Sequence, residues 1–217
     1  MAKGPAMSRE EAVKAIEVGI SMVADLKEKG YNVLATGEMG IGNTTTSSAV
    51  CSVLLDQSVE KVTGKGAGLT NKDLEHKIEV IRQSIALNKV NADDPLDVLA
   101  KVGGLDIAGM AGCYIGGAAL NIPVFIDGFI SSVAALIAIR LVPECAPYLF
   151  PSHCSNEPAG RMILDAIGKQ PYIFANMCLG EGTGAVMGFT IADYAFKAYW
   201  ELPSFEQTNF GTYEELN

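Results

Sequence analysis

The sequence contains few of the side chains that build metal centres or disulfide frameworks. It has only two histidines, His76 and His153, and its five cysteines are scattered with no C-x-x-C pair. Zinc sites need clustered thiolates and imidazoles, and disulfide frameworks need an even set of cysteines. We therefore expect neither, and the cysteine pattern indicates a reducing compartment such as the cytoplasm.

Positive charge and uninterrupted apolar runs are also scarce. The formal net charge is −9, which argues against nucleic acid as a partner because binding it needs a basic surface. The N-terminus lacks the apolar core of a signal peptide. Asp127 and Gly128 interrupt the apolar run at 123–142, so we predict a short strand and a buried helix there rather than a membrane span.

Strand-like and helix-like segments alternate along the rest of the chain. Hydrophobic residues make up 49% of it, enough for one sizeable core. Ser8 and Glu11 form a capping box that predicts a helix over 9–29, and Thr70 predicts the start of another. Strands are expected at 31–36, 122–127, 147–150 and 171–175, with a strand end at 61–63. The alternation predicts an α/β fold of Rossmann type, a parallel sheet with helices on both faces.

The segment "GEMGIGNT" at 37–44 has the spacing of a nucleotide-triphosphate phosphate loop, with Asn43 in place of the lysine. Its backbone N–H groups and the following helix could hold a phosphate. The alternative is a tight strand–helix turn with Asn43 as cap. Asn43 cannot neutralise a phosphate, so Lys65 or Lys77, in and after the next glycine loop, would have to supply the charge.

Two carboxylates stand beside glycines. Glu181 lies in "LGEGTGA" before a helix, which suits a general base, although the helix dipole alone could account for it. Glu38 lies inside the first glycine loop, where a functional carboxylate would face a ribose hydroxyl or a cationic ring; the alternative is a solvated loop carboxylate. Ser152 and His153 in "PSHCS" suggest a hydrolase, but the sequence has no G-x-S-x-G elbow. Ligands of parallel α/β folds bind at the carboxyl ends of the strands, where these loops are expected.

Five ordered segments together resemble nicotinate-nucleotide–dimethylbenzimidazole phosphoribosyltransferases, the CobT family. They are "GEMGIGNTT", "KVGGLDIAGMAG", "PVFIDGFISSVAAL", "PSHCSNEPAG" and "LGEGTGA". The resemblance implies transfer of the phosphoribosyl group of nicotinate mononucleotide to 5,6-dimethylbenzimidazole for the lower ligand of cobalamin. Nicotinate leaves, the anomeric carbon inverts, and neither a metal nor another cofactor takes part.

The resemblance also implies roles for single residues. Glu181 matches the catalytic base that takes the proton from the benzimidazole, and Lys77 matches the phosphate lysine. Desolvation of a glycine-flanked carboxylate in an apolar pocket would favour proton uptake near neutral pH. The other implied substrate-binding residues are Gly40, Ile41 and Gly66 at the phosphate, Gly42 in the same loop as Gly40, Glu38, Gly128 and Ser155 around the ribose and leaving base, and Leu179 and Gly180 at the base site.

Members of this family are longer at the N-terminus, so part of a small helical domain and of the base pocket is expected to be missing. We divide the chain into a helix at 1–30 that belongs to or borders the small domain, an α/β phosphoribosyltransferase domain at 31–200 and a polar tail at 201–217. A homodimer is expected, with or without a separate N-terminal piece. Two alternatives stay open: a truncated or split chain that binds nucleotide without turnover, and a relative with another azole or a phenol as acceptor.

Overall fold

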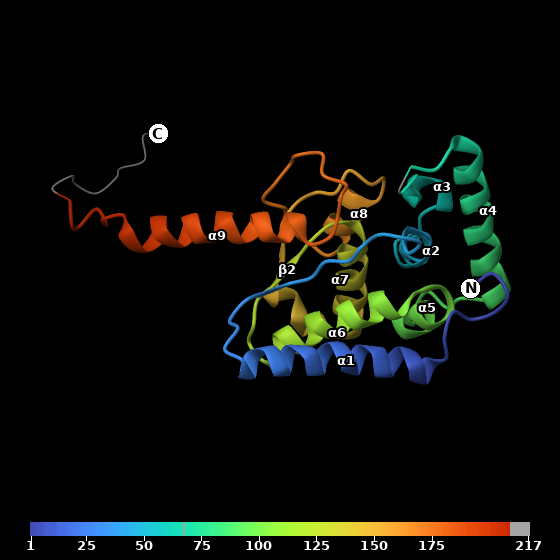
Figure 1. The fold of residues 1–217 in the computed structure, drawn as a ribbon, viewed down its shortest axis with the longest axis horizontal. Coiled ribbons are helices and arrows are strands. Elements are labelled where there is room, and N and C mark those ends of the chain that lie inside the picture. The colour runs from blue at the N-terminus through green and yellow to red at the C-terminus, as the bar shows by residue number, and fades with distance from the viewer. Residues whose placement is uncertain (67, 209–217) are drawn as a thin grey trace.

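A computed structural model describes residues 1–66 and 68–208 of the chain (Figure 1). Its helices are α1 (Arg9–Glu28), α2 (Thr44–Leu54), α3 (Val59–Val62), α4 (Asn71–Asn88), α5 (Pro95–Val102), α6 (Leu105–Ala119), α7 (Phe129–Leu141), the 3-10 helix η1 (Pro143–Tyr148), α8 (Gly160–Ala166) and α9 (Thr183–Glu201). Its strands are β1 (Leu34–Ala35), β2 (Val124–Ile126) and β3 (Leu149–Pro151).

The strands form a parallel sheet with β2 in the middle. Leu34 of β1 pairs with Val124 of β2, which in turn pairs with Leu149 of β3. Helices α6, α7 and α9 all contact β2. The predicted α/β fold with a parallel sheet and flanking helices is therefore confirmed.

The apolar run at 123–142 folds as β2 followed by the buried helix α7, as predicted. The side chains from Val133 to Ala138 are almost fully shielded, because helices α2, α5, α6 and α8 all pack against α7. Within residues 1–66 and 68–208, none of the helices has the length and apolarity needed to cross a membrane.

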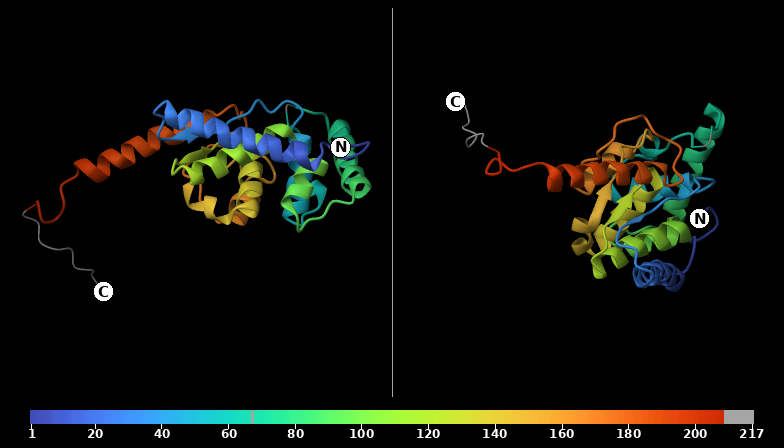
Figure 2. Two further views of the ribbon diagram at one scale, coloured as in Figure 1. Left: turned by 90° about the horizontal axis from the view of Figure 1, so that it is seen from below. Right: turned by 60° about the vertical axis from the view of Figure 1, so that its left-hand side comes forward.

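Helices α1 and α6 lie side by side (Figure 2). Small residues allow this approach: a β-carbon built on Gly19 of α1 would sit 2.0 Å from the carbonyl oxygen of Gly109. The α1 N-terminus carries the predicted capping box, in which Ser8 and Glu11 each accept the other's backbone N–H. Thr70 likewise accepts the N–H of Asp73 at the start of α4.

Three strand predictions need correction. The strand expected at 31–36 is reduced to the two residues of β1, and Ala35 is exposed rather than buried. Residues 59–62 form α3, so no strand ends at 61–63. At 171–175 only an isolated bridge joins Ile173 to His153. Strand propensity yields a ladder only where a neighbouring strand is available, and residues 31–33 find none among the described residues. Ile173 shares backbone hydrogen bonds with Ser152 and Cys154, just beyond the end of β3, but this pairing does not extend into a ladder.

Helix α9 extends away from the rest of the fold (Figures 1 and 2). Beside α9, from Gly188 to Tyr199, a hollow of about 730 Å³ opens towards β2 and β3, with Phe125, Phe150 and Phe189 in its wall. The second half of α9 exposes large side chains, among them Tyr199 and Trp200 at 76% and 77%. The predicted division of the chain into domains stays a prediction, and of the predicted tail the residues 209–217 lie outside the described part.

Candidate active site

A cavity of about 440 Å³ opens at the carboxyl ends of the three strands. Parallel strands end at one edge of a sheet, so the loops that follow β1, β2 and β3 meet there. The segment before α9 closes the same space. The cavity is lined by Glu38, Met39, Gly40, Ile41, Thr44, Gly66, Gly128, Phe129, Ile130, His153, Ser155, Glu157, Cys178, Leu179, Gly180 and Glu181.

Most of the residues singled out in the sequence thus share one cavity, although their loops are far apart along the chain. Of the residues for which the resemblance implied a role, Gly42 and Lys77 are the two that are not in its wall. Gly42 belongs to the turn between β1 and α2, and Lys77 reaches the cavity through a hydrogen bond to Thr44. Seven wall residues were not predicted as site residues; they are Met39, Thr44, Phe129, Ile130, His153, Glu157 and Cys178.

The turn between β1 and α2 has the backbone of a glycine-dependent loop. Gly40 and Gly42 have φ angles of +80° and +84°, which side chains other than glycine rarely adopt. Asn43 stands at the predicted cap position but makes no capping hydrogen bond. Its amide instead donates to carboxylate oxygens of Glu38 and Asp106, at 2.7 Å each. Asn43 therefore ties two acidic residues together and supplies no positive charge.

The positive charge next to this loop comes from Lys77 on α4. Its ammonium group is buried and donates to Thr44 Oγ1 at 2.9 Å and to the Gly64 carbonyl at 3.0 Å. Burial lowers the pKa of Lys77, and the negative charge of Glu157 partly opposes this. Thr44 begins α2, so the ammonium group lies at the positive end of a helix. An anion bound there would be attracted by the ammonium group and by the helix dipole.

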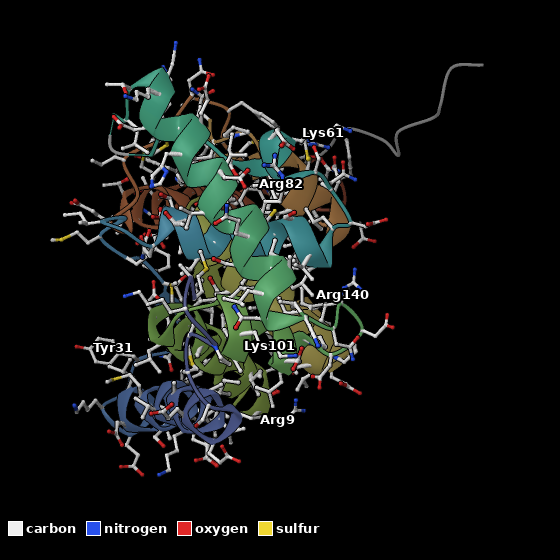
Figure 3. The ribbon with its side chains drawn as sticks, turned by 90° about the vertical axis from the view of Figure 1, so that its right-hand side faces the viewer. Arg9, Tyr31, Lys61, Arg82, Lys101 and Arg140 are labelled. Carbon is white, nitrogen blue, oxygen red and sulfur yellow. The ribbon has the colours of Figure 1, made fainter. Side chains whose placement is uncertain are left out.

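Other basic residues lie on the exterior. Arg9 pairs with Asp94 at 2.6 Å, and Arg82 on α4 pairs with Glu60 and Glu79. Figure 3 shows Arg9 on α1 and Arg82 on the side of α4 next to α3. These guanidinium groups are engaged with surface carboxylates, whereas the Lys77 ammonium group is buried next to the cavity.

The first and last glycine motifs are joined directly. The backbone N–H of Glu181 donates to the carbonyl oxygen of Glu38 at 2.9 Å. The Glu38 carboxylate accepts from the N–H of Gly40 as well as from Asn43. Glu181 itself has a φ angle of +58°, a left-handed conformation that costs about 1 kcal/mol or more for a residue with a side chain. The surrounding contacts must hold this residue in place.

The side chain of Glu181 is exposed, which corrects the expectation of a desolvated carboxylate. It projects from the wall of the cavity, and none of the described residues covers it. Leu179 next to it is exposed as well, at 64%. The side of the site expected to hold the aromatic base is therefore open in this chain.

Asp127 was not predicted as a site residue, although its position after the strand was noted. It follows β2 directly, is only 2% exposed, and its carboxylate accepts three backbone N–H groups at the start of α9. They belong to Gly182 (2.9 Å), Gly184 (2.8 Å) and Ala185 (3.2 Å). A buried anion at the positive end of a helix is favourable, so Asp127 anchors the turn that carries Glu181. An acidic residue directly after a buried strand was the available signal.

Known proteins share the sequence and the fold of this chain. The family model described as phosphoribosyltransferase matches residues 1–210. The nicotinate-nucleotide–dimethylbenzimidazole phosphoribosyltransferase of Ruminiclostridium cellulolyticum is 55% identical over 99% of this chain. The chain belongs to this family. The enzyme of the same name from Acetivibrio thermocellus is 52% identical over 99% of the chain, and the resemblance inferred from the five motifs is confirmed.

Solved structures of the family agree with the fold. A crystal structure of CobT from Thermus thermophilus superposes with a TM-score of 0.89 at 35% identity, and covers 95% of this chain. The chain spans 61% of the length of each of these two family members and of that crystal structure. For this chain, the activity of the longer proteins is therefore a proposal.

Proposed function

We propose that this chain transfers the phosphoribosyl group of nicotinate mononucleotide to 5,6-dimethylbenzimidazole, releasing nicotinate and α-ribazole 5′-phosphate. The observation that supports this is the arrangement of the cavity at the strand ends. Glycine-rich turns with the buried Lys77 lie on one side of it, and the glycine-flanked Glu181 projects from another. Transfer of a phosphoribosyl group needs an anion site for the phosphate and a base near the anomeric carbon.

In this reaction the bond between C1′ and the pyridinium nitrogen breaks, and a bond from C1′ to one azole nitrogen forms on the opposite face. Nicotinate leaves with the electron pair of the broken bond. The azole gains positive charge on attack unless its other nitrogen loses a proton. We assign this proton to the Glu181 carboxylate, which acts as general base. The pyridinium is already a good leaving group, so no further acid is required.

Most of the substrate-binding assignments lie in the cavity wall. We propose that the turns containing Gly40, Ile41, Gly42 and Gly66 bind the phosphate, together with Lys77. The backbone N–H of Gly40 is an exception, since it donates to the Glu38 carboxylate. Glu38, Gly128 and Ser155 surround the ribose and the leaving base. Leu179 and Gly180 line the acceptor base.

We further propose that this chain works as part of a larger assembly in the cytoplasm. Tyr199 and Trp200 of α9 and the hollow beside Phe189 present apolar surface that water would disfavour. A second copy of the chain or a separate segment equivalent to the remaining length of the relatives would cover it. The five cysteines are all free, which suits a reducing compartment.

The test is to incubate the purified chain with nicotinate mononucleotide and dimethylbenzimidazole and to detect α-ribazole phosphate by chromatography with mass detection. We expect turnover to fall about a hundredfold or more in Glu181→Gln, because glutamine keeps the shape of the side chain but cannot act as the base. The matched control is Glu17→Gln on the exposed side of α1, which should retain full activity. Wild-type turnover in Glu181→Gln would contradict the assignment of the base.

Two other outcomes would change the proposal. Nucleotide binding without product would identify a chain that holds the donor substrate but needs further residues for transfer. Product with another azole or a phenol, formed faster than with dimethylbenzimidazole, would change the acceptor. Both are measured in the same assay by adding calorimetry and a set of competing acceptors.

A further inference from the structure

His153 is a buried polar residue of the cavity wall to which the proposed reaction gives no role. It follows β3, and its side chain is only 2% exposed although it lines the cavity. Its ring fits between glycines: a β-carbon on Gly184 would sit 2.0 Å from Nδ1, and one on Gly128 would sit 3.6 Å from Nε2. The space at Gly184 is therefore filled by the imidazole, and its Nε2 edge faces Gly128 of the cavity wall.

The neighbours of His153 determine which ring nitrogen carries the proton. The hydroxyl of Ser152 donates to the carbonyl oxygen of Ile126 at 2.7 Å, and that oxygen can only accept. The Ser152 oxygen is therefore free to accept from His153 Nδ1, which lies 3.0 Å away. Burial lowers the pKa of His153, and the negative charge of Asp127 only partly opposes this. The lowered pKa favours the neutral ring.

A neutral imidazole with its proton on Nδ1 has an acceptor lone pair on Nε2. Among the described residues, no hydrogen-bond donor to Nε2 is present. Such an atom on a cavity wall calls for a donor from the ligand. Nicotinate mononucleotide with its carboxylate ionised and its phosphate fully deprotonated has hydrogen-bond donors only in its two secondary ribose hydroxyls.

We propose that His153 Nε2 accepts a hydrogen bond from a secondary ribose hydroxyl of the donor nucleotide, and so selects ribosyl over deoxyribosyl substrates. The inference rests on the proposed function, because it takes the ligand from it. It adds a specificity-determining residue on the wall beside Gly128, one of the positions assigned to the ribose. The bond is made by a fixed tautomer, since Ser152 and Ile126 hold the other end of the ring.

The experiment measures binding to the 217-residue chain by calorimetry. The ligands are nicotinate mononucleotide and its 2′-deoxy and 3′-deoxy analogues. His153→Asn keeps an amide donor near the Nδ1 position but lacks the Nε2 acceptor, whereas His153→Gln places an amide oxygen near Nε2. His76→Asn is the matched control, because His76 is the other histidine of the chain and is exposed. Chemical denaturation of each variant checks that it is folded.

We expect the wild type to bind one of the two deoxy analogues about tenfold more weakly than the ribosyl form, the loss typical of one hydrogen bond. His153→Asn should bind the ribosyl form about tenfold more weakly and no longer distinguish it from that analogue. His153→Gln should restore part of the preference, and His76→Asn should bind like the wild type.

The outcomes separate this inference from the proposed function. Equal weakening of all three ligands in His153→Asn would indicate a packing role and overturn the inference. Unchanged preference in that variant, or a wild type that binds all three ligands equally, would overturn it too, while the proposed function would stand. No nucleotide binding by the wild type would refute both.

Discussion

Replacing Asp127 by alanine is the most direct test of how the site is held together. The carboxylate accepts three N–H groups at 2.8–3.2 Å and is 2% exposed. A hydrogen bond to a charged group contributes about 1.5–3 kcal/mol, and bonds that share one acceptor do not add fully. We therefore expect Asp127→Ala to lower the free energy of unfolding by about 3–5 kcal/mol.

The assay is urea denaturation of the wild type and the variant, with the slope of the transition compared to confirm that both unfold alike. Asp93→Ala is the matched control: Asp93 is exposed, and surface replacements change stability by about 0.5 kcal/mol or less. Without urea, where the Asp127→Ala variant is folded, it should still bind the donor nucleotide more weakly than the wild type. The reason is that the turn with Gly180 and Glu181 loses its anchor. A loss of stability below about 1 kcal/mol would refute the anchoring argument.

Two further predictions concern Lys77 and its neighbour Glu157. Lys77→Gln should weaken nicotinate mononucleotide binding about tenfold or more, whereas Lys65→Gln, at an exposed lysine, should leave it nearly unchanged. Both affinities are measured by calorimetry. A larger loss of affinity in Lys65→Gln than in Lys77→Gln would assign the phosphate charge to Lys65. Burial raises the pKa of Glu157 above its ordinary value of 4.5, with the Lys77 charge opposing. The folded state therefore holds this proton longer than the unfolded state, so its contribution to stability is present below pH 4.5 and is lost as the pH rises through the folded-state pKa. Glu157→Gln should thus gain stability relative to the wild type across that window in urea denaturation, and a difference that does not change with pH would contradict it.

Local signals accounted for much of the fold. The start of α1 was predictable because Ser8 and Glu11 satisfy each other's backbone N–H within one turn. Thr70 at the start of α4 acts in the same way. The buried helix α7 followed from an apolar run too short to span a membrane. These features depend on neighbours three or four residues away, so the sequence carries them directly.

The strands were less predictable because pairing partners are distant. Residues 31–36 and 171–175 have strand-like composition, yet only Leu34 and Ala35 join the sheet. Whether such a segment becomes a strand depends on a neighbour with free backbone groups. The exposure of Glu181 has a similar cause, since burial depends on what other segments cover it.

The sequence by itself determined the order of the glycine-rich motifs and the caps of α1 and α4, because these are properties of short segments. The role of Glu181 as base came from the resemblance and stays a prediction. Only the tertiary structure decided that Asp127 anchors the α9 turn from 55 or more residues away, and that Lys77 rather than Lys65 points to Thr44. It also decided that Nε2 of His153 faces Gly128, on the loop after β2. Hydrogen bonds between remote segments depend on how the parallel strands bring their carboxyl ends together, and no local pattern records that arrangement.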